Sequence, residues 1–155
     1  MTGVVAAHPQ PGEPAPDFEL PGTAGAFRLS AQRGMPVVLL FYPGDETTVC
    51  TRQFCSYRDR FEELALLGAI AVGISPQSVD SHVRFSGHHG LTIPLLADVD
   101  QEVARAYGVT SRLIGTKRAT FVIDGDGIVR HRHENLLSIT YDSVDDLRNA
   151  LAALV

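Results

Sequence analysis

The sequence contains no tryptophan and only two cysteines among its 155 residues. It also lacks any apolar run near the ~20 residues of a membrane-spanning helix, and its first residues lack the basic start and apolar stretch of a secretory signal. Acidic residues outnumber basic ones, and the net charge of -5 argues against nucleic acid or an anionic membrane as a partner. We therefore expect a cytoplasmic protein whose cysteines serve catalysis or redox sensing rather than a structural disulfide.

The two cysteines, Cys50 and Cys55, are separated by four residues. They form no Cys-x-x-Cys pair, so a dithiol site of the thioredoxin type is not supported. The absence of tryptophan disfavours a glutathione-peroxidase site that relies on one. A thiol at the start of a predicted helix, with a second thiol close behind it, points to thiol redox chemistry.

Metal binding receives little support from the sequence. A zinc site needs about four ligands, and the two cysteines lack a matching second pair. His88 and His89 are adjacent, so their side chains should diverge on a helix. His131 and His133 lie on one side of a predicted strand, where such histidines are usually solvated. We expect no metal site.

The chain length suits one globular domain. Residues 1–13 carry no hydrophobic periodicity, so we expect a loosely held N-terminal tail before a single domain over residues 14–155. Periodicity and turn residues predict the elements of that domain. The predicted strands span 17–20, 26–30, 37–42, 69–75, 93–98, 119–124 and 127–132, and the predicted helices span 49–67, 78–88, 100–107 and 143–154.

This order places a hairpin before a β-α-β-α-β run, which is followed by a helix, a second hairpin and a last helix. The nearly all-apolar strand 37–42 suits a position covered on both faces. Gly125 and Asp126 indicate a two-residue connection between the last strands, and Ser143 and Asp146 have capping-box spacing. We predict an α/β fold with a central mixed β-sheet flanked by helices and an N-terminal β-hairpin. A thioredoxin-like fold fits this pattern, and so do other three-layer α/β folds.

Cys50 is predicted at the start of helix 49–67, with Thr47 or Thr48 as its cap. Free backbone N–H groups and the positive end of the helix dipole stabilise a thiolate there. The helical stripe also turns Cys50 inward, and burial alone disfavours the charged form. A nearby cation is therefore needed, and Arg118 is the best candidate because arginine stays charged when partly buried. The alternative is a solvated Arg118 at a strand edge.

The spacing of the cysteines sets a condition on any disulfide between them. Five residues along an α-helix correspond to about 7.5 Å of rise and about 140° of rotation, which separates the two Cα atoms by roughly 8.6 Å. A disulfide needs these atoms within about 7 Å. Cys50 and Cys55 therefore cannot pair while the helix is intact, and a disulfide between them requires its first turns to unwind.

Several segments resemble the peroxiredoxin family. Pro43-x-x-x-Thr47-x-x-Cys50 is similar to that family's active-site motif. Cys50-x-x-x-x-Cys55 resembles its atypical two-cysteine subgroup, peroxiredoxin Q or bacterioferritin-comigratory protein. The resemblance covers about residues 12–150. Further matching segments are GEPAPDFELPG, LSAQRG, VVLLFYP and RATFVID.

The resemblance implies a role for each matched residue. Cys50 would be the peroxidatic thiolate, which attacks hydrogen peroxide or an alkyl hydroperoxide and becomes a sulfenic acid. Thr47 would hold the peroxide in line, Pro43 would shield the pocket, and Arg118 would stabilise the charge of the transition state. Cys55 would resolve the sulfenic acid as an intramolecular disulfide.

The resemblance also implies what the protein works with. Thioredoxin or a similar dithiol would reduce the disulfide, and no metal, haem or flavin would be needed. We expect a cytoplasmic antioxidant enzyme, monomeric or weakly homodimeric, with no nucleic-acid or membrane partner. Asp45 and Glu46 are expected to be solvated loop residues. Thr48 departs from the subgroup, which usually carries proline there, and this difference concerns how readily the first helical turn unwinds.

Two other functions stay open from the sequence. A non-enzymatic thiol redox sensor would use the same disulfide to change partner binding. An interaction protein of the holdase kind would require assembly and exposed apolar surface. The rate of peroxide consumption separates a sensor from an enzyme, and light scattering after oxidation tests the holdase.

Overall fold

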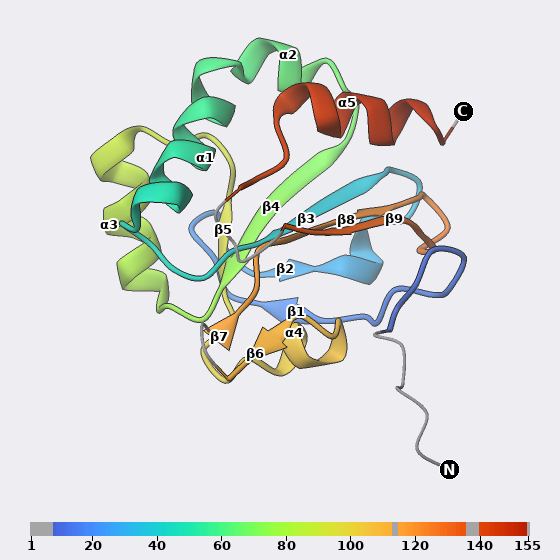
Figure 1. Ribbon diagram of the computed structural model, residues 1–155, viewed down its shortest axis with the longest axis horizontal. Coiled ribbons are helices and arrows are strands. Elements are labelled where there is room, and N and C mark those ends of the chain that lie inside the picture. Colours follow the sequence, from blue (N-terminus) through green and yellow to red (C-terminus); the bar gives the residue numbers. More distant parts are fainter. Residues whose placement is uncertain (1–7, 113–114, 136–139, 155) are drawn as a thin grey trace.

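The fold is built on a central five-stranded sheet. The computed structural model describes residues 8–112, 115–135 and 140–154 (Figure 1). The strands of the central sheet are β3 (Val37–Phe41), β4 (Ile70–Ser75), β5 (Leu95–Ala97), β8 (Ala119–Ile123) and β9 (Val129–Glu134). Their order is β5-β4-β3-β8-β9, in which β4 runs parallel to β3 and β5, and β8 runs antiparallel to β3 and β9. The predicted mixed sheet is thus confirmed.

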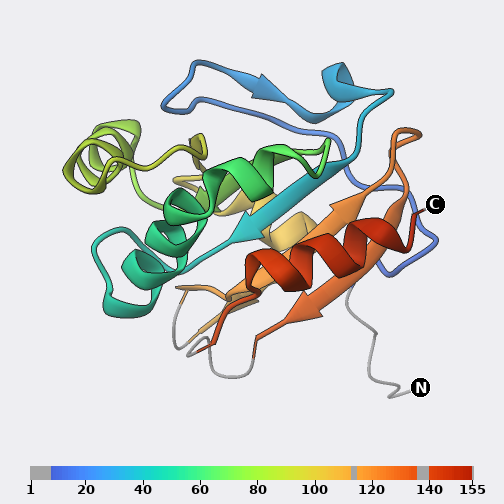
Figure 2. The same cartoon turned by 90° about the horizontal axis from the view of Figure 1, so that it is seen from above.

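Helices cover both faces of this sheet. They are α1 (Thr48–Asp59), α2 (Phe61–Ala65), α3 (Val79–His89), α4 (Glu102–Ala106) and α5 (Val144–Ala152), with a short 3-10 turn, η1 (Leu29–Gln32). Two small antiparallel sheets pair β1 (Glu19–Leu20) with β2 (Phe27–Arg28) and β6 (Thr110–Ser111) with β7 (Gly115–Thr116). Figures 1 and 2 show α1, α2 and α5 over one face, whereas β1, β2 and α4 lie on the other. Within the described ranges, none of the helices is long and apolar enough to cross a bilayer.

Strand β3 runs through the middle of the sheet and is buried along its whole length. Because alternate residues of a strand point to opposite faces, Leu39 and Phe41 join the core cluster that also contains residues of α4. Leu40 and Tyr42 join the cluster formed with α1, α3 and α5. Burial on both faces explains why this strand is an uninterrupted apolar run.

The predicted helix over 49–67 is wrong in one respect, because the structure divides it into α1 and α2. Arg60, between them, has φ -110° and ψ 33°, outside the helical region. Its guanidinium lies 2.9 Å from the carboxylate of Asp145 in α5. The apolar stripe keeps its spacing across the break, and Leu64 is still buried. Periodicity alone therefore did not reveal the break.

The connection between β8 and β9 is longer than predicted. Ile123 pairs with Val129, so residues 124–128 connect the strands instead of Gly125 and Asp126 alone. The carboxylate of Asp124 accepts hydrogen bonds from two backbone N–H groups of the turn, at 2.9 and 3.0 Å, which stabilises the wider turn. The β6–β7 pair was not predicted, because strands of two residues are too short for a periodic pattern.

The described part of the predicted tail lies against the domain. The N–H of Gly12 donates to the carbonyl of Val129 at 2.7 Å, and the carbonyl of Glu13 accepts from the N–H of Val129 at 2.9 Å. Residues 8–13 are therefore attached to the start of β9 rather than loose. Residues 1–7 lie outside the described residues, and the division of the chain at residue 14 stays a prediction.

Candidate active site

Cys50 lies in the first turn of α1. The chain leaves β3 at Phe41, and Thr47, with φ -76° and ψ 152°, is the N-cap residue of the helix. Cys50 is fully buried and belongs to the core cluster that contains Tyr42 and Phe54. The first-turn N–H groups of a helix have no partner within the helix, and they carry the positive end of its dipole. The position of Cys50 at a helix start is therefore as the sequence predicted.

Arg118 is brought to Cys50 by the sheet. Strand β8 pairs with β3 so that Ala119 lies opposite Phe41, which places Arg118 beside the end of β3 that leads to α1. The Nη2 atom of Arg118 lies 2.9 Å from Cys50 Sγ, and Arg118 is 2% exposed. The alternative of a solvated Arg118 is therefore excluded. The structure therefore places a permanent positive charge next to the sulfur, as the sequence predicted.

Two further residues hold Arg118 in place, and the sequence prediction missed them. Gln53, one turn after Cys50, accepts a hydrogen bond from Nη1 of Arg118. Its Nε2 donates to Tyr57 Oη at 3.0 Å, and Tyr57 Oη donates to the carbonyl of Asp142 at 2.7 Å. Burial raises the pKa of Tyr57, so its hydroxyl stays a neutral donor. The sequence signal that could have revealed this role is a polar glutamine on the inward side of the predicted helix.

The loop between β3 and α1 carries two other residues predicted at the site. Pro43 follows Tyr42 directly and is half-buried. Thr47 is exposed, and its hydroxyl donates to the carbonyl of Gly44 at 3.1 Å. Thr47 is thus the N-cap residue by its backbone, but it makes no side-chain cap, so that part of the prediction is wrong. The hydroxyl oxygen keeps lone pairs that can accept a further hydrogen bond.

Cys55 lies in the same helix as Cys50 and is half-buried, and both are free thiols. Helix α1 is continuous from Thr48 to Asp59. The distance argument from helix geometry therefore applies to this structure, and the two sulfurs cannot join without a local change of α1.

Asp45 is held by the protein, which corrects its prediction as a solvated loop residue. Its side chain is 2% exposed. The carboxylate accepts hydrogen bonds from Tyr42 Oη and Ser81 Oγ and pairs with His82 Nδ1, each at 2.7 Å. Burial alone would raise the pKa of Asp45, but these three partners hold its pKa below the ordinary value. The cluster ties the loop before α1 to helix α3.

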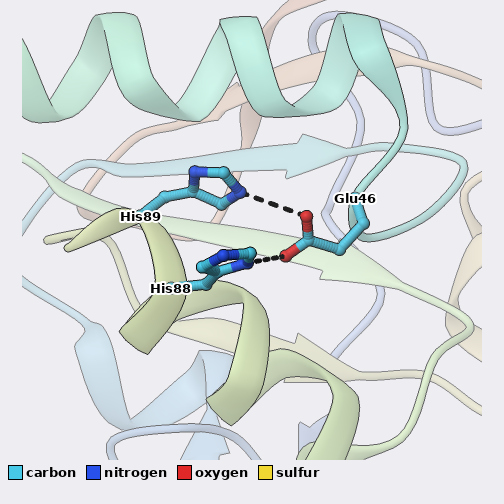
Figure 3. A group of neighbouring side chains, drawn as sticks. All are labelled: Glu46, His88 and His89. Atoms are coloured by element: carbon cyan, nitrogen blue, oxygen red, sulfur yellow. Dashed lines mark hydrogen bonds and ion pairs between the residues drawn. The ribbon is translucent and has the colours of Figure 1, made fainter.

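Glu46 also has partners on α3 (Figure 3). Its two carboxylate oxygens lie 3.2 Å from His88 Nδ1 and 3.1 Å from His89 Nε2. The predicted divergence of the two histidines is therefore wrong, because they reach the carboxylate through different ring nitrogens. Hydrogen bonds from His89 and His88 lower the pKa of Glu46. In the part of the chain that the structure describes, these are three side chains close enough to share a metal ion.

Comparisons of the sequence with known proteins agree on one family. Residues 11–132 match the AhpC/TSA family. Peroxiredoxin Q, chloroplastic, from Triticum aestivum is 39% identical over 137 residues, which cover 86% of this chain and 63% of that protein. Peroxiredoxin Bcp from Bacillus subtilis (strain 168) is 39% identical over 124 residues, which cover 75% of this chain and 79% of that protein. The chain spans only 58–63% of the length of the wheat and rice relatives that it matches.

Solved structures agree with this relationship. Peroxidoxin BcpB from Mycobacterium tuberculosis superposes with a TM-score of 0.80 at 38% identity, over 95% of this chain and 97% of that one. A bacterioferritin comigratory protein from Xanthomonas campestris, described for its alkyl peroxide reduction activity, has a TM-score of 0.77 at 28% identity, over 88% of this chain and 91% of that one. The predicted thioredoxin-like fold is thus confirmed, and the other three-layer arrangements are excluded.

Proposed function

The chain belongs to the AhpC/TSA family, in its peroxiredoxin Q and Bcp group, and we propose that it is a thiol-dependent peroxidase. Its substrates are hydrogen peroxide and alkyl hydroperoxides, a class supported by the alkyl peroxide reduction described for the Xanthomonas campestris relative. The observation that carries the proposal is the 2.9 Å contact between Arg118 Nη2 and the buried Cys50 Sγ at the start of α1.

The first chemical step uses Cys50 as the nucleophile. Its thiolate attacks one peroxide oxygen, so that an S–O bond forms while the O–O bond breaks. The second oxygen takes up a proton and leaves as water or as an alcohol. The sulfur is oxidised by two electrons to a sulfenic acid, and the peroxide is reduced by the same two electrons.

The surrounding groups support this step. Arg118 and the N–H groups of the first turn, at Val49 and Cys50, stabilise the negative charge that moves from the sulfur to the leaving oxygen. The Thr47 hydroxyl, which donates to a backbone carbonyl at 3.1 Å, accepts the peroxide O–H and holds it in line. Pro43 shields the reacting atoms from water. These residues place and stabilise the peroxide without covalent participation.

Cys55 completes the reaction by forming a disulfide. After the first turns of α1 unwind, the Cys55 thiolate attacks the sulfenic sulfur of Cys50, an S–S bond forms, and the hydroxyl leaves as water with one proton. Thioredoxin or a similar dithiol then reduces this disulfide through a mixed disulfide and returns both thiols. Two electrons enter from the dithiol for each peroxide reduced, so a metal, haem or flavin is not part of the proposed cycle.

The cellular setting is also part of the proposal. We place the enzyme in the cytoplasm as an antioxidant peroxidase, a monomer or weak homodimer with one domain over residues 14–155. Plant relatives are named chloroplastic, so the compartment is a separate question from the chemistry. Fractionation of the source cells would test the compartment, and analytical ultracentrifugation of reduced protein would test the oligomeric state.

The test is a thiol count and an intact mass within seconds of adding one equivalent of hydrogen peroxide to reduced protein. The expected result is loss of both thiols and an internal Cys50–Cys55 disulfide. Cys50→Ser should abolish turnover, and Cys55→Ser should consume one equivalent, gain one oxygen atom and stop. Thiols that persist for many minutes, or steady thioredoxin-coupled turnover by Cys55→Ser, would contradict the proposal.

The two alternatives from the sequence are not favoured, because the relatives are named as peroxiredoxins. A redox sensor would consume peroxide no faster than an ordinary thiol. A holdase would suppress the aggregation of a client protein after oxidation, as measured by light scattering. The same preparation of protein serves both measurements.

A further inference from the structure

A second group of reactive side chains lies beside the loop that leads to Cys50. Glu46, two residues before α1, faces His88 and His89 at the end of α3, and one ligand atom from each lies within 4.8 Å of the others. Figure 3 shows both imidazole rings turned toward the one carboxylate. We propose that these three residues bind Zn²⁺ or a similar first-row divalent cation.

The types of ligand atom in this group indicate which metal ions would bind. Two imidazole nitrogens and one carboxylate oxygen suit zinc and its neighbours, whereas Mg²⁺ and Ca²⁺ prefer oxygen ligands alone. Ligand atoms about 2.0–2.1 Å from a tetrahedral Zn²⁺ lie roughly 3.4 Å apart. Each imidazole nitrogen lies close to one of the two carboxylate oxygens, at 3.2 and 3.1 Å, and one ligand atom from each of the three residues lies within 4.8 Å of the others. Three protein ligands leave one position for water.

The two histidines converge because they use different ring nitrogens. His88 faces the carboxylate with Nδ1, which is near its backbone, and His89 faces it with Nε2, at the far end of the ring. The His89 ring packs edge-on against Phe85, with 5.4 Å between the ring centroids, so its orientation is supported from inside the protein. His88 and Glu46 are 73% and 49% exposed, which leaves an open path for a cation.

The loop that carries Glu46 has a defined conformation. The backbone of Glu46 has a positive φ of 60°, which is uncommon for a residue other than glycine. The neighbouring Asp45 is fixed to α3 through Ser81 and His82. The loop therefore presents Glu46 to α3 in a defined position.

An ion bound at this place would affect disulfide formation, and this inference rests on the proposed function. Thr47, the N-cap of α1, follows Glu46 directly. A cation held between Glu46 and α3 would fasten the start of α1, whereas the Cys50–Cys55 disulfide requires that start to unwind. We therefore expect Zn²⁺ to slow disulfide formation.

Binding is measured first, without the thiols, because thiolates themselves bind zinc. Isothermal titration calorimetry of ZnCl₂ into the full chain carrying Cys50→Ser and Cys55→Ser should give one Zn²⁺ per chain. Circular dichroism melting of each protein checks that it is folded. Absence of binding would overturn the proposal and leave an ordinary surface cluster of ion pairs.

Single substitutions in that background then identify the ligands. Glu46→Gln, His88→Asn and His89→Asn should each weaken Zn²⁺ binding at least about tenfold, because each removes one of three ligands. His131→Asn, a histidine on β9 outside the group, is the matched control and should bind as the parent does. Equal affinity in the parent and all three ligand variants would overturn the assignment.

The effect on the reaction is measured separately with wild-type cysteines. Reduced protein with one equivalent of Zn²⁺ receives hydrogen peroxide, and disulfide formation is followed by mass spectrometry after acid quenching. Zn²⁺ should slow the wild type several-fold and leave His88→Asn unaffected. Equal slowing of both proteins would mean that zinc acts on the thiols, and it would overturn the restraint of α1. Failure of both proteins to form a disulfide without zinc would count against the proposed function, while the calorimetric result would still decide the metal site.

Discussion

The guanidinium of Arg118 lies 2.9 Å from the sulfur of Cys50, although 68 positions separate the two residues in the sequence. The antiparallel pairing of β8 with β3 makes the contact, because it fixes the start of β8 beside the loop that leads to α1. Arg118 directly precedes strand β8, whereas Cys50 lies in helix α1. Unwinding of α1 for disulfide formation would separate the sulfur from its cation.

Replacing Arg118 with glutamine should lower the second-order rate constant for hydrogen peroxide by about 10²–10³-fold, the usual effect of losing a donor to a developing charge. Arg118→Lys should lower it about tenfold or more, because one ammonium cannot bind Cys50 and Gln53 together. Stopped-flow single-turnover kinetics of reduced protein measures the constant. Lys117→Met is the control, since Lys117 pairs with Glu134 at 3.7 Å on the surface, and it should stay within about twofold. A near-normal rate constant for Arg118→Gln would contradict the role of the arginine.

Gln53 is expected to act through Arg118, as a positioning residue. Gln53→Leu removes the acceptor for Nη1 of Arg118 and the donor to Tyr57, so the rate constant should fall about tenfold. A double-mutant cycle gives the sharper readout. In the Arg118→Lys background the same substitution should change the rate constant by less than about threefold. Equal losses in both backgrounds would indicate a general structural role instead.

Thr48→Pro should stabilise the fold and slow the disulfide step. Thr48 is the first residue of α1, a position that suits proline, and Thr47 before it is extended with ψ 152°, as a residue before proline requires. The free energy of unfolding should rise by about 0.4–1 kcal/mol, and disulfide formation should slow about two- to fivefold if unwinding limits it. Chemical denaturation and quenched mass spectrometry measure the two effects. With Thr48→Ala as the control, higher stability without slower disulfide formation would show that unwinding is not limiting.

Asp45→Asn should lower the free energy of unfolding at pH 7 by about 1–3 kcal/mol, because it weakens a buried carboxylate cluster. A carboxyl whose pKa is lowered in the folded state stabilises the fold above its ordinary pKa of 3.8, and that stability is lost as the pH falls through the lower folded value. The difference between wild type and variant should therefore be complete at pH 7 and shrink below about pH 4. Urea denaturation across this range measures it. The exposed Asp126→Asn is the control, and a difference for Asp45→Asn that stays constant at low pH would refute the argument.

Elements that are determined by residues close together in the sequence were predicted well. The apolar run that forms β3 was assigned within one residue, and Ser143 and Asp146 form both hydrogen bonds of the predicted capping box, at 2.8 and 3.1 Å. The break at Arg60 was missed, because the apolar stripe continues through it and the residue interacts with the distant Asp145. Periodicity reports which side of an element faces the core, and it does not report where a helix bends.

The candidate site also contains features that depend on neighbouring residues and features that depend on distant ones. The motif from Pro43 to Cys55 is continuous in sequence, so the thiol at a helix start and the unwinding requirement followed from spacing alone. Gln53 was missed although it lies within this segment, because its role depends on a cation from another strand. Asp45 was wrongly predicted as solvated because its partners on α3 are more than thirty positions away, and the same separation hid the histidine partners of the exposed Glu46.

The sequence by itself determined that Cys50 lies at the start of a helix with Cys55 close behind it, and it determined most of the order of strands and helices, because these depend on neighbours within a few residues along one element. Only the tertiary structure decided that Arg118 reaches the sulfur and that α3 holds Asp45 and Glu46. Both contacts depend on how strands pair and how a helix packs across the sheet, and hydrophobic burial drives that packing without marking which polar residues will meet.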